Sequence, residues 1–88
     1  MMIKRDKKNE EYGKKMHFVL QIILKKGLDL VDSQAIASIL GVSMPTANRY
    51  LLSISASFNI PIVRIGNKNY LVMNKELLKK FPPSARIR

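Results

Sequence analysis

The apolar positions between residues 16 and 26 recur with helical spacing and predict the first helix. The run MHFVLQIILKK contains no helix breaker, ends in lysines that suit the negative helix terminus, and precedes Gly27, which favours a C-cap. Phe18 and Ile22 lie outside its main apolar stripe, which consists of Met16, Leu20, Ile23 and Leu24. Two explanations for the second stripe stay open: it packs under the hairpin or the C-terminal helix, or it forms a homodimer interface.

Two further helices follow in close succession. Gln34–Leu40 carries apolar residues at helical spacing, and either Asp32 or Ser33 can cap its start. Gly41 ends this helix, because glycine readily adopts the left-handed conformation of a C-cap. Ser43 then caps a third helix, whose apolar positions are Ala47, Tyr50, Leu51, Ile54 and Phe58.

From residue 60 onward the pattern changes from helical to extended. Ile60–Ile65 and Tyr70–Met73 are β-prone runs separated by Gly-Asn-Lys-Asn, whose glycine and asparagines tolerate the positive φ angles of a hairpin loop. These runs predict a β-hairpin. With a loop of this length, Arg64 lies on the same face as Leu71, and the sequence leaves open which face joins the core.

The two ends of the chain differ in composition from its centre. Residues 1–15 are rich in lysine and poor in core-forming side chains, so they predict a basic arm, either flexible or continuing into the first helix. Asn74 can cap a short helix, Lys75–Phe81, and the following proline pair separates it from a basic tail, residues 82–88. We therefore expect one domain, residues 16–81, of mainly α class with a small β-hairpin (α+β).

The charge of the chain narrows its range of partners. Sixteen Lys and Arg against six Asp and Glu give a formal net charge of +10. Such an excess repels itself unless a polyanion balances it, and nucleic acid is the first candidate. A helix that binds an anionic membrane surface would need a clean apolar face, usually edged by Trp or Phe, and the chain has no Trp. We expect no membrane partner.

Other sequence features limit the cellular location and the chemistry expected of the protein. The absence of cysteine excludes disulfides and thiolate metal sites and fits the cytoplasm. The apolar stretch from Met16 to Leu24 is too short to span a bilayer, and the basic start lacks a signal-peptide cleavage site. With a single histidine and no Gly-rich phosphate loop, the usual catalytic constellations are missing. We expect no enzyme activity, cofactor, metal or small-molecule ligand.

The segment Ser33–Leu51, SQAIASILGVSMPTANRYL, suits two short helices that cross at a steep angle. Ala37 is small where the helices approach, Gly41 permits the turn, and Val42 fills the angle between them. At these positions the chain resembles the helix-turn-helix family of DNA-binding domains. Because a hairpin follows directly, it more closely resembles winged helix-turn-helix proteins, which include many bacterial, archaeal, phage and plasmid regulators, over most of its length.

The resemblance implies that the third helix lies in the major groove of double-stranded DNA. Arg49 can then pair with guanine or a phosphate, and Asn48 can make two hydrogen bonds to adenine. The other candidates from this helix are Ser43, Met44, Pro45 and Thr46. The hairpin would reach a DNA backbone or minor groove through Arg64, Asn67, Lys68 and Asn69. Each polar residue of the helix alone also fits a solvated surface, but the grouping within the motif favours contact for Asn48 and Arg49. The hairpin residues also fit a plain polar turn.

These observations predict a DNA-binding protein, first of all a stand-alone, sequence-specific transcriptional regulator that reads two half-sites as a homodimer. A plasmid-partition, replication or excision accessory factor could use the same fold, and so could a protein-interaction module. RNA binding fits less well, because the few aromatic residues form no stacking surface interleaved with basic residues. Salt dependence separates charge-driven binding of nucleic acid from protein docking.

Overall fold

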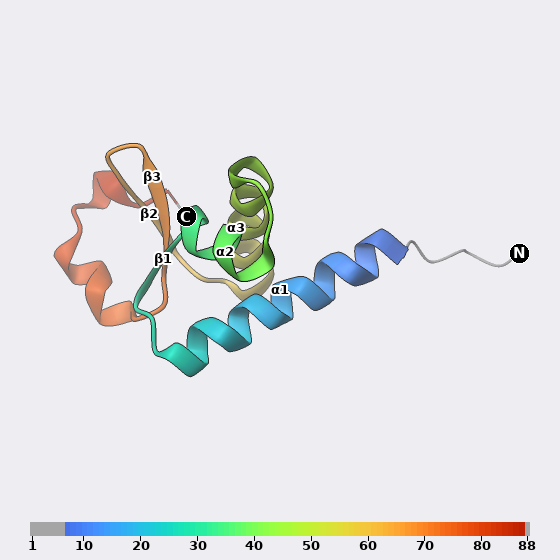
Figure 1. The fold of residues 1–88 in the computed structure, drawn as a ribbon. Helices are drawn as coiled ribbons and strands as arrows, with labels where there is room; N and C mark the ends of the chain where they lie inside the picture. The colour runs from blue at the N-terminus through green and yellow to red at the C-terminus, as the bar shows by residue number, and fades with distance from the viewer. Residues whose placement is uncertain (1–6, 88) are drawn as a thin grey trace, which may run out of the picture.

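The chain is described by a computed structural model that covers residues 7–87, with side chains from Glu10 onward. Its helical elements are α1 (Lys7–Lys26), α2 (Ser33–Leu40), α3 (Met44–Phe58) and the 3-10 segments η1 (Lys75–Lys80) and η2 (Pro83–Ala85). Its strands are β1 (Leu30–Asp32), β2 (Ile62–Ile65) and β3 (Lys68–Val72), in the spatial order β1-β3-β2. Figure 1 shows α2 and α3 on one side of this antiparallel sheet and the C-terminal segments on the other. The predicted α+β class is confirmed.

Helix α1 begins at Lys7, well before the predicted start at Met16. Tyr12, in the segment predicted as an arm, packs on α3. Its ring stacks on Tyr50 with 4.2 Å between ring centroids, and its hydroxyl forms a 2.8 Å hydrogen bond with Ser53 Oγ. The segment 1–15 was expected either to be flexible or to continue into the first helix. From residue 7 onward it is part of α1. Residues 1–6 lie outside the described part.

The buried face of α1 is rotated relative to the predicted stripe. Val19 and Ile23 are fully buried, whereas Leu24, which was expected on the apolar stripe, is 63% exposed. Tyr12 and Met16 continue the buried face toward the N-terminus at helical spacing and are partly buried. Of the second apolar stripe, Phe18 is 49% exposed and Ile22 is half-buried.

The connection from α2 to α3 follows the predicted turn. Asp32 caps α2 by accepting a hydrogen bond from the backbone N–H of Ala35. Gly41 adopts the left-handed conformation, with φ 66° and ψ 41°, and donates its N–H to the Ala37 carbonyl at 2.8 Å. Ser43 caps α3 by accepting a hydrogen bond from a backbone N–H in its first turn. These local contacts set the directions in which both helices leave the turn.

The sheet contains a strand that the sequence pattern did not predict. Leu30–Asp32 pairs with β3, with Val31 opposite Leu71. The hairpin turn is also tighter than expected. Ile65 pairs with Lys68, so Gly66 and Asn67 alone form the loop, and Gly66 takes the required positive φ of 61°. The shorter loop keeps Arg64 on the same face as Leu71, and this is the face that joins the core.

The C-terminal segment covers the second face of the sheet. Asn74 caps η1 as predicted, although the segment is a 3-10 helix and ends at Lys80. Residues 83–87, predicted as part of a basic tail, continue the fold: Arg86 forms an isolated bridge with Val63, and the Ile87 N–H donates to the Ile62 carbonyl at 3.0 Å. The tail therefore runs along β2, and Val63 on the outer face of that strand is fully buried.

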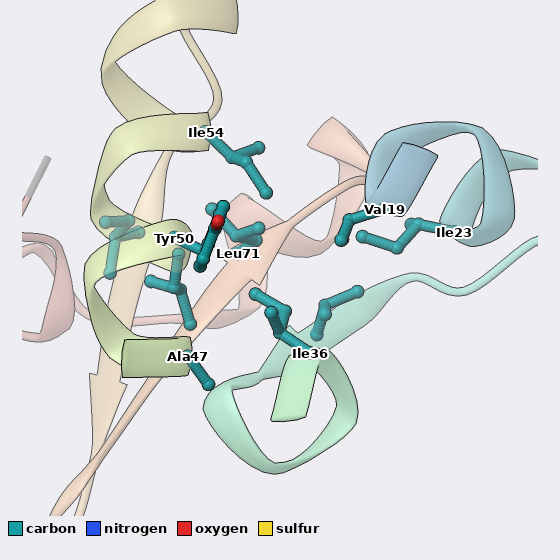
Figure 2. Close-up of a cluster of buried hydrophobic side chains, with 10 residues drawn as sticks. Val19, Ile23, Ile36, Ala47, Tyr50, Ile54 and Leu71 are labelled. Atoms are coloured by element: carbon teal, nitrogen blue, oxygen red, sulfur yellow. The ribbon is translucent and has the colours of Figure 1, made fainter. Parts of the chain in front are cut away.

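The main core lies where α1, α2, α3 and the sheet meet. Figure 2 shows side chains from all of these elements converging there, among them Ile23, Ile36, Ile54 and Leu71. Tyr50 lies in the same cluster and is 5% exposed. Burial raises the pKa of its hydroxyl above its ordinary value, and the nearby Tyr12 and Glu11 add to the effect. Within residues 7–87, no helix combines the length and hydrophobicity needed to cross a membrane.

Tyr12→Ala should lower the free energy of unfolding by about 1–3 kcal/mol, because it removes both the ring stack and the hydroxyl hydrogen bond. As a control, Leu24→Ala changes an exposed side chain of the same helix and should cost less than about 0.5 kcal/mol. Urea denaturation followed by circular dichroism measures both. Equal effects would show that the first half of α1 does not pack on α3.

Candidate nucleic-acid interface

Helix α3 divides into a buried and an exposed face. Its buried face consists of Ala47, Tyr50, Leu51, Ile54 and Ser55. On the opposite side, Pro45 and Arg49 are exposed and Asn48 is half-buried. Leu52 lies on this face one turn after Asn48 and is 39% exposed. The fold therefore leaves a mixed polar and apolar helix surface open to a partner.

An open groove of about 450 Å³ separates the start of α3 from the hairpin. It is lined by residues from the end of β1, the starts of α2 and α3, and the tip of the hairpin. These are Asp32, Ser33, Gln34, Met44, Pro45, Asn48, Arg64, Asn67, Lys68 and Asn69. Segments far apart in the sequence thus place polar and cationic groups around one surface.

Most of the residues predicted to bind DNA line this groove, and three of them do not. Met44, Pro45, Asn48 and the four hairpin candidates lie in it together. Ser43 and Thr46 lie beside it and bond to each other, since the Ser43 hydroxyl donates to Thr46 Oγ1 at 3.0 Å. Arg49 is exposed on α3 but does not line the groove.

A hydrogen bond orients the side chain of Asn48. The Ser33 hydroxyl at the start of α2 donates to Asn48 Oδ1 at 3.2 Å. This contact engages the side-chain carbonyl and leaves the amide nitrogen as a donor. The predicted pair of hydrogen bonds to adenine needs the oxygen and the nitrogen together. The oxygen keeps a second lone pair, so Asn48 can still offer both its oxygen and its nitrogen to a partner, while the hydrogen bond from Ser33 orients the amide.

The hairpin contributes two cations to the groove, and an acidic residue opposes one of them. Lys68 Nζ lies 3.8 Å from Asp32 Oδ2, and the Lys68 side chain remains 55% exposed. Arg64 is exposed on the neighbouring strand, opposite Asn69. Because an ion pair this exposed contributes little to stability, Lys68 can exchange its carboxylate partner for an external anion at low cost.

Asn69 carries a polar atom that the fold leaves without a partner. Within the described residues, its Oδ1 is a buried side-chain oxygen with no hydrogen bond. A buried, unpaired acceptor of this kind costs about 1–3 kcal/mol. Asn69 is one of the residues that line the groove, so this buried oxygen belongs to a side chain at its wall.

The sequence pattern missed four residues of this surface. Asp32, Ser33 and Gln34 line the groove from the start of α2, and Leu52 extends the exposed face of α3. The sequence indicates Asp32 and Ser33 only as alternative caps of α2. Their place in the groove depends on the pairing of β1 with β3, which no local pattern shows. Leu52 could have been found, because it falls outside the buried positions of its helix.

Among residues 7–87, no group of three or more His, Cys, Asp or Glu side chains could hold a metal ion. Comparisons of the chain with models of protein families, with curated proteins and with solved structures gave no match.

Ser33→Ala should lower the free energy of unfolding by about 0.5–1.5 kcal/mol, because it removes the partner of a half-buried amide. The side-chain amide signals of Asn48 in an NMR spectrum should shift as well. Ser38→Ala, an exposed position on the same helix, should change stability by less than about 0.5 kcal/mol and leave those signals in place. Identical behaviour of the two variants would mean that Ser33 does not hold Asn48.

Proposed function

We propose that the chain is a winged helix-turn-helix protein that binds double-stranded DNA. In this arrangement α3 enters the major groove, and the β2–β3 hairpin is the wing, which contacts the backbone or the minor groove. The observation that carries the proposal is the groove between the start of α3 and the hairpin. Met44, Pro45 and Asn48 line it from α3, and Arg64 and Lys68 line it from the hairpin.

The exposed face of α3 has side chains suited to base edges. Asn48 offers amide donors, Arg49 offers a guanidinium that can pair with guanine, and Leu52 offers apolar contact to a thymine methyl group. The start of the helix also favours phosphate, because its unpaired backbone N–H groups and positive dipole end attract anions. Pro45 has no N–H and the Thr46 N–H is bonded to Ser43, so the N–H of Met44 is the group of that first turn without an intrahelical partner.

The hairpin has the shape and charge of a phosphate-binding wing. Its two-residue loop is narrow, and Arg64 and Lys68 flank it. Asn67 at the tip is exposed and can donate to a sugar or phosphate oxygen. The net charge of +10 supports the same partner, because a polyanion would relieve the self-repulsion of the chain. A protein-docking module would not need this charge.

We infer a role as a non-enzymatic, sequence-specific transcriptional regulator of prokaryotic, phage or plasmid type, acting in the cytoplasm. The groove supports recognition of a nucleic acid rather than catalysis, since it contains one carboxylate, two cations and amides but no histidine or cysteine. Selection of bound duplexes from a random library would give the preferred site and show whether it consists of two related half-sites.

Binding to a duplex should weaken steeply with salt, because each neutralised phosphate releases counterions. The logarithm of the association constant should fall against log[salt] with a slope of about −0.9 for each phosphate contacted. Lys68→Ala should make this slope shallower by about one unit. Fluorescence anisotropy with a labelled duplex measures both values. The proposal fails if no duplex binds even at low salt, and an unchanged slope in the variant would exclude the wing from contact.

Asp32→Asn should strengthen duplex binding by about threefold or more, because it removes a carboxylate that repels phosphate and competes for Lys68. The asparagine oxygen can still accept the capping hydrogen bond from Ala35, so α2 should remain intact. The matched control is Glu76→Gln, which removes an equal charge from the exposed surface of η1, outside the groove. An equal gain in both variants would indicate a general charge effect and no specific role for this groove.

Arg49→Ala should weaken specific binding by about 1–3 kcal/mol and relax the preference at one base position, if Arg49 reads a base. Arg86→Ala removes the same charge on the far side of the sheet and should leave the preference unchanged. Competition binding against duplexes with single substitutions measures this difference. Uniform weakening across all sequences would assign Arg49 to a phosphate instead.

A further inference from the structure

One flank of α1, beside the core-facing residues Val19 and Ile23, has an apolar centre with charged residues around it. Phe18 is 49% exposed, and Ile22, which lies one turn after it, is half-buried. Glu11, Lys15 and Lys25 share this face, because the five positions are separated by alternating steps of four and three residues. This spacing defines a continuous seam along a helix of the kind that pairs with another helix. We call these five residues the outer seam.

The outer seam is open to an approaching partner. All its charged members are exposed. Figure 1 shows the first turns of α1 extending beyond the other elements. Scattered single apolar residues are normal on protein surfaces. In the outer seam, however, two apolar residues adjoin in the centre and charges of opposite sign lie at the ends.

We propose that the outer seam binds the outer seam of a second copy of this chain, with the two α1 helices antiparallel and centred on Phe18. In such a two-fold pair, residues at equal distances before and after Phe18 face each other. Glu11 and Lys25 lie equally far from Phe18, so each Glu11 faces Lys25 of the other copy. The same symmetry places the two Phe18 rings together at the centre. Parallel helices would instead place Glu11 on Glu11 and Lys25 on Lys25.

The small contact area and the charge of each copy imply a weak, reversible dimer. One pair of helices buries less surface than a standard interface, and the +10 charge of each copy opposes association. We therefore expect a dissociation constant on the order of 10–100 µM. None of the groove residues belongs to the outer seam, so this dimer does not rest on the proposed binding of DNA. It would leave the groove of both copies free for a site made of two halves.

The first test is the mass of the full chain in solution as a function of concentration. Sedimentation equilibrium between about 1 and 500 µM should show a monomer–dimer equilibrium. Phe18→Lys should raise the dissociation constant by at least about tenfold, because it introduces two like charges at the centre. Leu24→Lys adds the same charge at another exposed position of α1, off the outer seam, and should leave association nearly unchanged.

A second test distinguishes the antiparallel arrangement from other contacts. Glu11→Lys and Lys25→Glu should each raise the dissociation constant about threefold to tenfold, because each creates two like-charged pairs. The variant with both changes has the original net charge and restores both pairs in reverse, so it should return to within about twofold of the original value. Circular dichroism checks that all variants keep their helical content.

Two results would overturn the proposal. One is a chain that stays monomeric over the whole concentration range, and the other is a Leu24→Lys variant as impaired as Phe18→Lys. If the variant with both changes associates as weakly as the two single variants, the antiparallel pairing of Glu11 with Lys25 is wrong. Binding to a duplex could persist in each of these cases, so failure of the dimer is distinguishable from failure of the proposed function.

Discussion

The position of helix α3 depends on the packing of its apolar face against α2 and the sheet. Ala47, Leu51 and Ile54 are fully buried in one cluster with Ile36 and Leu71. Ala47 matters because a small side chain lets the two helices approach closely near their shared turn. The left-handed Gly41 and the caps at Asp32 and Ser43 then fix the angle between α2 and α3. Without this packing, the exposed face of α3 would not lie beside the hairpin.

The same strand connects this core to the groove. Leu71 of β3 is buried in the core, and two residues earlier Asn69 lines the groove on the same face. The core therefore fixes the position of the hairpin tip relative to the start of α3. Asp32 connects a third element, because it ends β1, caps α2 and pairs with Lys68. The groove is thus held by the hydrophobic core and by short polar contacts at its edge.

The sequence predicted the features that depend on local chemistry. The cap at Ser43, the turn at Gly41 and the hairpin all follow from residues adjacent in the chain. The missed features depend on distant partners. Strand β1 is too short to show alternation and forms only because β3 lies beside it, and the packing of Tyr12 requires Tyr50 and Ser53 of α3. The membership of Asp32 and Ser33 in the groove likewise follows from tertiary structure. The resemblance to helix-turn-helix proteins, by contrast, was enough to point to Met44, Pro45 and Asn48.

We propose that α3 and the hairpin bind one duplex together through the groove between them. This can be tested by an NMR titration of the isotopically labelled chain with a duplex obtained by selection from a random library. Signals of Asn48, Arg64 and Lys68 should shift together and saturate at the same concentration, while Lys75 and Arg86 on the other face stay in place. Absence of shifts, or shifts centred on Lys75 and Arg86, would contradict it.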